Sequence, residues 1–452
     1  MARHTPRARF TTRPGVFPAD PAAADEAHLE LSNRLHGILI DSMQSGSAFG
    51  YALSSVPKNR SGRMKAFEPC TNPHHLRVRA AFDGTRADRI AVCEQAFASS
   101  VASRILGREM ITGSTDVHYY EACAWLEGEE AHEEFIERLY RDCVALHRHF
   151  DFDILFLPWR HAERPSKRVG EYQILYGDAE GADWSIRQFD PGSRTFGVVN
   201  SGRPELTSEE VMTFMREFIA RPRPPGCCVE ADPLLLRAAR EHGREFVVAG
   251  VTGMAVPMAA GWLEATLLAP GLVGEYLDVA IENLLGQLDA QRTAGIWLVN
   301  GGGDFAFNSG PVYSPKFFRE VMAPRWKRVF DHCRSRGMAY IFRSDGNLWP
   351  VAEDLFDWAK PDAYYEVDHD AGMHFSELRR RFPGLTLIGN VSCGLLATGK
   401  PEEIRQQTIE CIKAAAPRMI AASSNAILHG TPPENVEALF DTAKAYSAEA
   451  RD

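Results

Sequence analysis

Charged side chains follow directly on an apolar run of strand length, residues 339–342. Arg343 and Asp345 stand two positions apart, so on a continued strand both side chains point to the same face. A carboxyl group there could transfer a proton, and the guanidinium could bind an anionic group or lower the carboxyl pKa. A structural ion pair is the alternative, because such pairs also occur outside active sites.

Other apolar runs end in polar groups of the same kind. Polar residues at such positions also cap helices and solvate loops, so no single one of them proves a site. As a set, they predict catalytic roles for Asp345, Arg343, Glu366 and His369, and substrate contacts from Trp159, Arg160, Asp304, Asn390 and Asn425.

Eight apolar runs alternate with segments of helical periodicity, which favours a parallel sheet covered on both faces. A closed (β/α)8 TIM barrel, an α/β fold, is the economical solution, and its active site lies at the carboxyl ends of the strands. The expected strands are residues 90–93, 154–157, 246–249, 295–299, 339–342, 363–367, 385–388 and 419–422. The expected helices are 133–148, 208–219, 233–241, 275–291, 315–336, 350–358, 375–382, 401–415 and 433–447.

The barrel is expected over residues 66–450, after an N-terminal extension at 1–65. That extension reads as a partly disordered basic arm with one helix at 24–44. Residues 167–203 resemble antiparallel strands, a β-hairpin-like insertion after the second barrel strand, and 221–226 form a proline-rich connector.

The composition excludes several classes of partner. The formal net charge of -10 argues against a nucleic-acid-binding surface, which needs a basic excess. The most apolar window, 250–274, is interrupted by prolines and Glu264, so no membrane span is expected. Nine cysteines without a C-x-x-C pair indicate reduced thiols, and we expect a cytoplasmic protein.

Four segments carry a family resemblance: GDFAFNSGPVYSPKFFREVMAPRWKRVFDHCRSRGM, FRSDGN, AGMHFSELRRRFPGLTLIGNVSCGLLATGKPEEI and SSNAILHGTPPENVEAL. They resemble the uroporphyrinogen decarboxylase superfamily, which includes the decarboxylase and the cobalamin-linked or thiol-linked methyltransferases. The upstream segments RVRAAFDGTRADRIAV and HFDFDILFLPWR are similar to the methyltransferase-type branch. The resemblance covers roughly residues 77–447 and implies the same barrel.

The chain departs from both branches at the positions that carry chemistry. Zinc methyltransferases of this superfamily have a His-x-Cys and a later Cys, where this chain has Arg343, Asp345 and Asn425. The conventional zinc site is therefore not expected, although carboxylate, imidazole and thiol groups could form another. The residues in question are Glu366, Asp368, His369, Cys393 and His161. The decarboxylase's Arg-Gln-Ala-Gly-Arg segment has no counterpart, but Arg160, Arg164 and Arg343 could bind a carboxylate.

The resemblance implies an enzyme, and methyl transfer from a small methylated substrate, such as an aromatic methyl ether, is the leading hypothesis. The acceptor would be a corrinoid on a separate protein, because the chain lacks the corrinoid-binding D-x-H-x-x-G motif. Asp345, Glu366 or His369 could protonate the leaving oxygen. Decarboxylation of a carboxylate-bearing substrate is the second hypothesis, and a non-catalytic barrel that binds a small ligand is the third.

Overall fold

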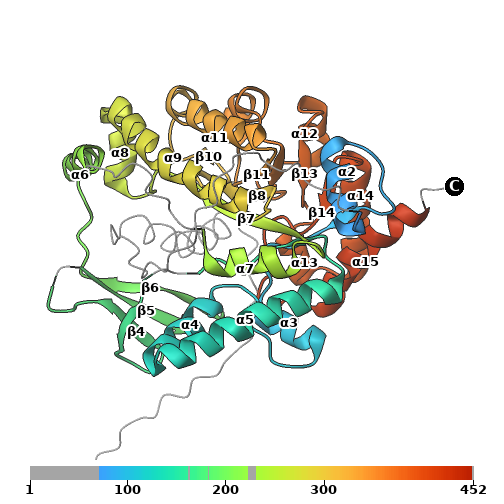
Figure 1. Ribbon diagram of the computed structural model, residues 1–452, viewed down its shortest axis with the longest axis horizontal. Helices are drawn as coiled ribbons and strands as arrows, with labels where there is room; N and C mark the ends of the chain where they lie inside the picture. The colour runs from blue at the N-terminus through green and yellow to red at the C-terminus, as the bar shows by residue number, and fades with distance from the viewer. Residues whose placement is uncertain (1–70, 161–162, 182, 222–230, 450–452) are drawn as a thin grey trace, which may run out of the picture.

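The computed structural model describes residues 71–160, 163–181, 183–221 and 231–449 (Figure 1). The expected N-terminal arm with its helix at 24–44, His161, and positions 222–226 of the connector lie outside these ranges.

Eight parallel strands form the central sheet, and each overlaps one of the eight predicted runs. Their order is β1-β14-β13-β12-β11-β8-β7-β2, in which every neighbouring pair is parallel. The predicted (β/α)8 barrel is confirmed. The strands are β1 (Ala91–Val92), β2 (Ile154–Leu155), β7 (Val247–Gly253), β8 (Leu298–Gly302), β11 (Ala339–Arg343), β12 (Ala363–Tyr365), β13 (Thr386–Ile388) and β14 (Met419–Ala421).

Asp153 closes the ring between β1 and β2. Its backbone N–H donates to the Val92 carbonyl at 2.8 Å, and its carboxylate accepts the Val92 N–H, also at 2.8 Å. This carboxylate is fully buried, and it is paired with Arg77 at 3.2 Å, Arg89 at 2.8 Å and His74 at 2.9 Å. The two arginines offset the cost of burying the charge.

Helices surround the strands on all sides in Figure 1. Proline opens several of them, where its missing N–H costs nothing. They are α2 (Pro73–Asp83), α3 (Ser99–Leu106), α4 (Asp116–Glu127), α5 (Glu129–Phe150), α6 (Ser208–Ala220), α7 (Pro233–His242), α8 (Ala260–Leu268), α9 (Pro270–Thr293), α10 (Pro315–Phe317), α11 (Ala323–Ser335), α12 (Phe375–Arg381), α13 (Cys393–Thr398), α14 (Pro401–Ala415) and α15 (Pro433–Glu449). Two π-helices, η1 (Phe318–Met322) and η3 (Glu353–Ala359), and one 3-10 helix, η2 (Trp349–Val351), are also present among the described residues.

Alternate side chains of the strands fill the barrel interior, and those between them pack against the helices. This double burial explains why the strands read as continuous apolar runs. The interior cluster includes Ile154, Val247, Ala249, Leu298, Ile341, Ala363, Tyr365, Ile388 and Ile420. Because strand side chains alternate, Arg343 continues the inward row of Ile341.

The insertion after β2 is a four-stranded antiparallel sheet, seen at the lower left of Figure 1. It packs on α4, where the ring of Tyr119 stacks on Phe189 with centroids 4.3 Å apart. The predicted antiparallel strands are thus present, whereas the hairpin β9 (Ala306–Phe307) with β10 (Gly310–Pro311) was not predicted. The insertion strands are β3 (Pro165–Arg168), β4 (Gln173–Gly177), β5 (Trp184–Asp190) and β6 (Thr195–Ser201).

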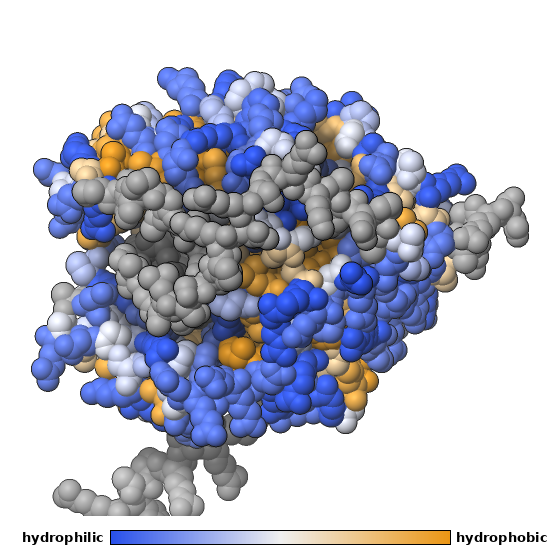
Figure 2. Space-filling view, viewed as in Figure 1, coloured by the Kyte–Doolittle hydropathy of each residue, from blue (hydrophilic) through white to orange (hydrophobic). Residues whose placement is uncertain are grey.

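The visible surface is mainly hydrophilic (Figure 2). Apolar atoms gather at the upper left, where Figure 1 places α8, and Leu267 and Leu268 of that helix are 72% and 66% exposed. Within the described ranges, none of the helices has the length and apolar character that crossing a membrane requires.

Candidate active site

The register of the barrel strands places Arg343 at the mouth of the barrel. Ile341 pairs with Asn300 of β8, and Asn300 with Val251 of β7, so these side chains share one level of the inner face. Arg343 lies one level higher, opposite Gly302, which has no side chain. Val251 is 47% exposed although it continues an inward row, so the mouth is open on this side.

Arg343 forms an ion pair with Glu366. Its Nη1 lies 3.2 Å from Glu366 Oε1, and Gln95 Nε2 donates to the same oxygen at 2.5 Å. Glu366 follows β12 with φ +59°, a conformation that side chains rarely adopt. Burial raises the pKa of Glu366 to about 7, although Arg343 opposes this increase, and the nearby Asp304 adds to it.

Asp345 is placed to keep a proton. Burial raises its pKa well above the usual range, and the negative charges of Asp304, Glu366 and Asp368 raise it further, while Arg343 lowers it. Asn425 Nδ2 donates to Asp345 Oδ2 at 3.2 Å and fixes the carboxyl group. A carboxylic acid that stays neutral at neutral pH can act as a proton donor.

The structure thus brings five predicted residues into one cluster, which we call the mouth cluster: Asp304, Arg343, Asp345, Glu366 and Asn425. Sequence reasoning did not select Gln95, Asn300 or Glu94 as site residues. Gln95 links Glu366 to Asn300, since Asn300 Nδ2 donates to Gln95 Oε1 at 3.2 Å. Glu94 and Asn300 stand at strand ends, which was the signal available in the sequence.

Glu94, which follows β1, is another buried carboxyl group. It accepts hydrogen bonds from the Ser423 N–H at 3.1 Å and the Tyr365 hydroxyl at 3.3 Å. Burial raises its pKa to about 7, against the opposing effect of these donors. Glu94 can therefore exchange a proton near neutral pH.

Two predicted site residues, Asp368 and Asn390, bind backbone groups of neighbouring loops. Asp368 Oδ1 accepts backbone N–H groups of Asp370 and Ala371 at 3.0 and 3.1 Å, and its Oδ2 accepts that of Gly346 at 3.3 Å. Asn390 Nδ2 donates to the Val367 carbonyl at 2.6 Å. Both side chains therefore position the segments that carry Asp345 and Glu366.

His369 and Cys393 also make local contacts. His369 pairs with Asp370 at 3.4 Å, which raises the imidazole pKa. The Cys393 thiol donates to the Ala426 carbonyl at 3.1 Å, and burial raises its pKa. Neither contact points to the predicted catalytic or metal-binding role.

Trp159 and Arg160 lie with the helices next to β2. Trp159 is 40% exposed and its ring lies 5.2 Å from that of His118 in α4. Arg160 pairs with Glu121 at 3.1 Å and with Asp232 at 3.4 Å. In the part of the chain that the structure describes, no hydrogen bond joins Arg160 to the mouth cluster.

The residues at the superfamily's zinc positions do not fit a zinc ion. Arg343 is a cation and would repel the metal, and Asp345 is bonded to the amide of Asn425. Among the described residues, no three His, Cys, Asp or Glu side chains are grouped so that they could hold a metal.

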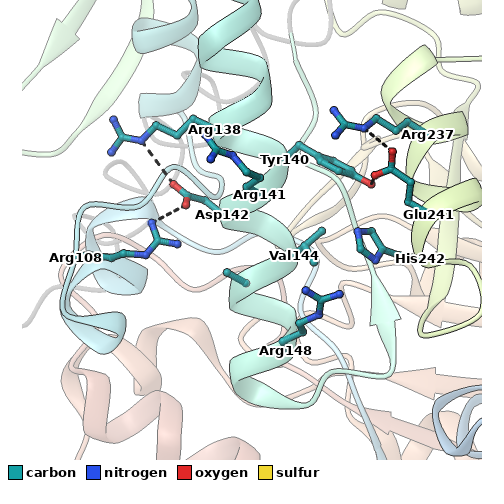
Figure 3. Close-up of a pocket in the computed structure, with 11 residues that line it drawn as sticks. Arg108, Arg138, Tyr140, Arg141, Asp142, Val144, Arg148, Arg237, Glu241 and His242 are labelled. Atoms are coloured by element: carbon teal, nitrogen blue, oxygen red, sulfur yellow. Dashed lines mark hydrogen bonds and ion pairs between the residues drawn. The ribbon is translucent and has the colours of Figure 1, made fainter.

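A pocket of about 600 Å³ lies outside the barrel, between α5 and α7 (Figure 3). Its arginines face acidic partners: Arg108 lies 2.7 Å from Asp142, and Arg237 lies 3.0 Å from Glu241. The Tyr140 hydroxyl also donates to Glu241, at 2.9 Å. These contacts form an ion-pair network at a helix interface, and the mouth cluster remains the candidate active site.

Known proteins resemble this chain in sequence and fold. The family model described as uroporphyrinogen decarboxylase (URO-D) matches residues 246–446. The uroporphyrinogen decarboxylase of Synechococcus sp. is 28% identical over 272 residues, 56% of this chain and 68% of that protein. The one from Prochlorococcus marinus is 26% identical over 269 residues, 55% of this chain and 73% of that protein. The structure of a methyltransferase from Methanosarcina mazei superposes with a TM-score of 0.55 at 18% identity, covers 82% of this chain and 98% of its own, and shares the fold.

Proposed function

We propose that this chain, a member of the uroporphyrinogen decarboxylase superfamily, is an enzyme that transfers a methyl group from a small methylated substrate to a corrinoid carried by a separate protein. The observation that supports this proposal best is the partly buried Asp345 carboxyl, whose raised pKa and hydrogen bond from Asn425 suit a proton donor. An aromatic methyl ether is one substrate of this kind.

Methyl transfer from an ether requires an acid that protonates the leaving oxygen. Methyl transfer breaks the bond between carbon and oxygen, and the oxygen keeps the bonding electron pair. Protonation of that oxygen by Asp345 removes the developing negative charge. Asn425 holds the carboxyl in place, and Arg343 would stabilise the Asp345 carboxylate once it has lost its proton.

The charges of the mouth cluster disfavour a substrate with many carboxylates. Arg343 already pairs with Glu366, and Asp304 adds a further acidic group beside them. Like charges brought together in a buried site repel each other strongly. Decarboxylation of a substrate with a single carboxylate stays the second candidate, because the similar proteins of Synechococcus and Prochlorococcus are decarboxylases.

The test uses the purified full chain with free reduced cobalamin as methyl acceptor. A panel of methyl ethers and methylated amines is added, and the absorption spectrum reports methylcobalamin. Parallel reactions with the carboxylated analogues measure released carbon dioxide. Methyl transfer that depends on Asp345 supports the proposal; carbon dioxide release alone assigns decarboxylation. Ligand binding without either product indicates a non-catalytic barrel.

A further inference from the structure

A chain of hydrogen bonds fixes the direction of two side-chain amides in the barrel mouth. A guanidinium only donates, so the Arg343 contact makes Glu366 Oε1 an acceptor. Gln95 must then donate its Nε2 to that oxygen and turn its Oε1 toward Asn300. Asn300 in turn donates its Nδ2 to Gln95, which leaves Asn300 Oδ1 directed elsewhere.

Three oxygen atoms around these hydrogen bonds can only accept, and no described residue supplies a donor to them. Asn300 Oδ1, Glu366 Oε2 and Asp304 Oδ1 are buried, and within the described ranges none of the three has a hydrogen-bond partner. Asn300 is 8% exposed and Glu366 is 3% exposed. An unpartnered buried polar atom costs about 1–3 kcal/mol, so three acceptors at one barrel mouth point to a donor that completes them.

The negative charges of the mouth cluster also favour a donor that carries a positive charge. Arg343 is already used by Oε1 of Glu366, and among the described residues no hydrogen-bond partner reaches the second oxygen, Oε2. Asp304 lies close enough to raise the pKa values of both Glu366 and Asp345. A ligand with a positive charge would relieve this repulsion.

We propose that the substrate carries a protonated amine, whose N–H groups donate to Asn300 Oδ1, Glu366 Oε2 and Asp304 Oδ1 in the barrel mouth. An ammonium has up to three donors and no acceptor, which matches three unpartnered acceptors. Val251, which pairs with Asn300 on the same inner face, is 47% exposed, so solvent reaches the barrel mouth at the level of Asn300. The ammonium is the group that anchors the substrate, while the methylated oxygen faces Asp345.

A metal cation is a poorer occupant of this place. Both carboxylate oxygens of Asp368 are taken by backbone N–H groups, and Asp345 is bonded to Asn425. In the described part of the chain, no three His, Cys, Asp or Glu side chains are grouped so that they could hold a metal. An organic ammonium only has to donate hydrogen bonds to these oxygens, and it needs no closed coordination shell.

The inference rests on the proposed function for the reaction, but its test measures binding alone. Benzylammonium, benzyl alcohol and benzoate have similar shapes and differ in charge, so they serve as matched probes. Calorimetry on the full chain at pH 8 should give benzylammonium a Kd about tenfold or more below that of benzyl alcohol, as for one charge-assisted contact. Benzoate should not bind. Equal or tighter binding of benzyl alcohol or benzoate would overturn the proposal.

Glu366→Gln removes one charge without changing the shape, and it should weaken benzylammonium binding about tenfold. Glu282→Gln on the outer face of α9 is the matched control and should leave the Kd unchanged, because Glu282 is an exposed carboxylate that pairs with surface Arg328. Asn300→Asp should tighten the binding, since it replaces a neutral acceptor with a charged one. Unchanged affinity in Glu366→Gln would refute the assignment, as would stoichiometric binding of Mg²⁺ or Ca²⁺ that displaces benzylammonium.

Binding should also strengthen between pH 6 and pH 8, because Glu366, with a pKa of about 7, ionises in this range while benzylammonium keeps its proton. The charged and titratable groups facing Glu366 are Arg343, Asp304, Asp345, Tyr364 and Tyr365. Selective binding without methyl transfer would leave this inference standing and refute the proposed function. Methyl transfer from uncharged ethers, with no preference for an amine, would support the proposed function and refute this inference.

Discussion

Arg343 Nη1 lies 3.2 Å from Oε1 of Glu366, and this contact joins the carboxyl ends of the neighbouring strands β11 and β12. Glu366 is 3% exposed, so its negative charge depends on this guanidinium. The pair therefore sets how many negative charges the barrel mouth carries, and its loss should affect stability and binding together.

Arg343→Met should lower the free energy of unfolding by about 3 kcal/mol at pH 8, because it leaves a buried carboxylate unpaired. Arg343 lowers the pKa of Glu366, so its removal raises that pKa further above about 7. The variant is thus most stable at low pH, where Glu366 is neutral, and it loses stability as the pH rises. Urea unfolding at pH 5 and pH 8 should show a smaller loss at pH 5; equal losses would contradict the argument. Arg343→Lys keeps the positive charge, so its free energy of unfolding at pH 8 should lie between those of the native chain and of Arg343→Met.

Asp345→Asn should reduce kcat by about 100-fold or more, the usual contribution of a general acid. In the native enzyme, activity should fall as the pH rises through the raised pKa of Asp345, because the proton is then lost. The variant should lack this decrease. Initial rates across a pH series, together with far-ultraviolet circular dichroism to confirm folding, check both points. Asp331→Asn on α11, which removes an exposed carboxylate, is the control and should retain full activity.

Gly302→Ala should destabilise the barrel strongly. A Cβ at this position would lie 1.9 Å from the Arg343 carbonyl oxygen, a backbone atom that cannot move without breaking the β8–β11 ladder. The expected loss is about 3 kcal/mol, as for other overpacked core positions. Gly286→Ala in α9 is the control, because nothing lies within 4 Å of its added Cβ. That change should stabilise the helix by about 0.8 kcal/mol, so thermal unfolding should separate the two variants in opposite directions.

Asp153→Asn should cost about 3–5 kcal/mol of unfolding free energy, because buried Arg77 and Arg89 lose the charge that they surround. Asp88→Asn breaks a pair of Arg77 with an exposed carboxylate and should cost less than about 1 kcal/mol. Chemical denaturation of both variants tests the comparison. Similar losses would mean that Asp153 is not the residue that closes the ring.

Glu94→Gln should flatten the dependence of stability on pH. The pKa of Glu94 in the folded chain, about 7, is above its ordinary value, so the folded state binds the proton more tightly than the unfolded state. Its contribution is greatest below the ordinary value and is lost as the pH rises toward and through about 7. Unfolding free energies measured from pH 4.5 to pH 8 should fall less steeply in the variant than in the native chain.

Much of the barrel could be predicted because its strands are buried on both faces. The runs around Ile154, Val247 and Ile341 are apolar throughout, and amphipathic segments separate them. The β9–β10 hairpin was missed because its paired residues, Ala306 with Pro311 and Phe307 with Gly310, are too few to form a pattern. The roles of Asp368 and Asn390 were also beyond prediction, because the backbone groups that they bind belong to loops whose course depends on the fold.

The sequence by itself determined the alternation of strands and helices, and with it the face on which Arg343, Asp345 and Glu366 stand, because periodicity and parallel strand direction follow from local composition. Only the tertiary structure decided which of these charges meet. Arg343 pairs with Glu366 and Asp345 with Asn425 because strand register and barrel closure bring residues 23 and 80 positions apart into contact. The raised pKa values of Asp345 and Glu366 depend on burial, which arises only when the whole ring is closed.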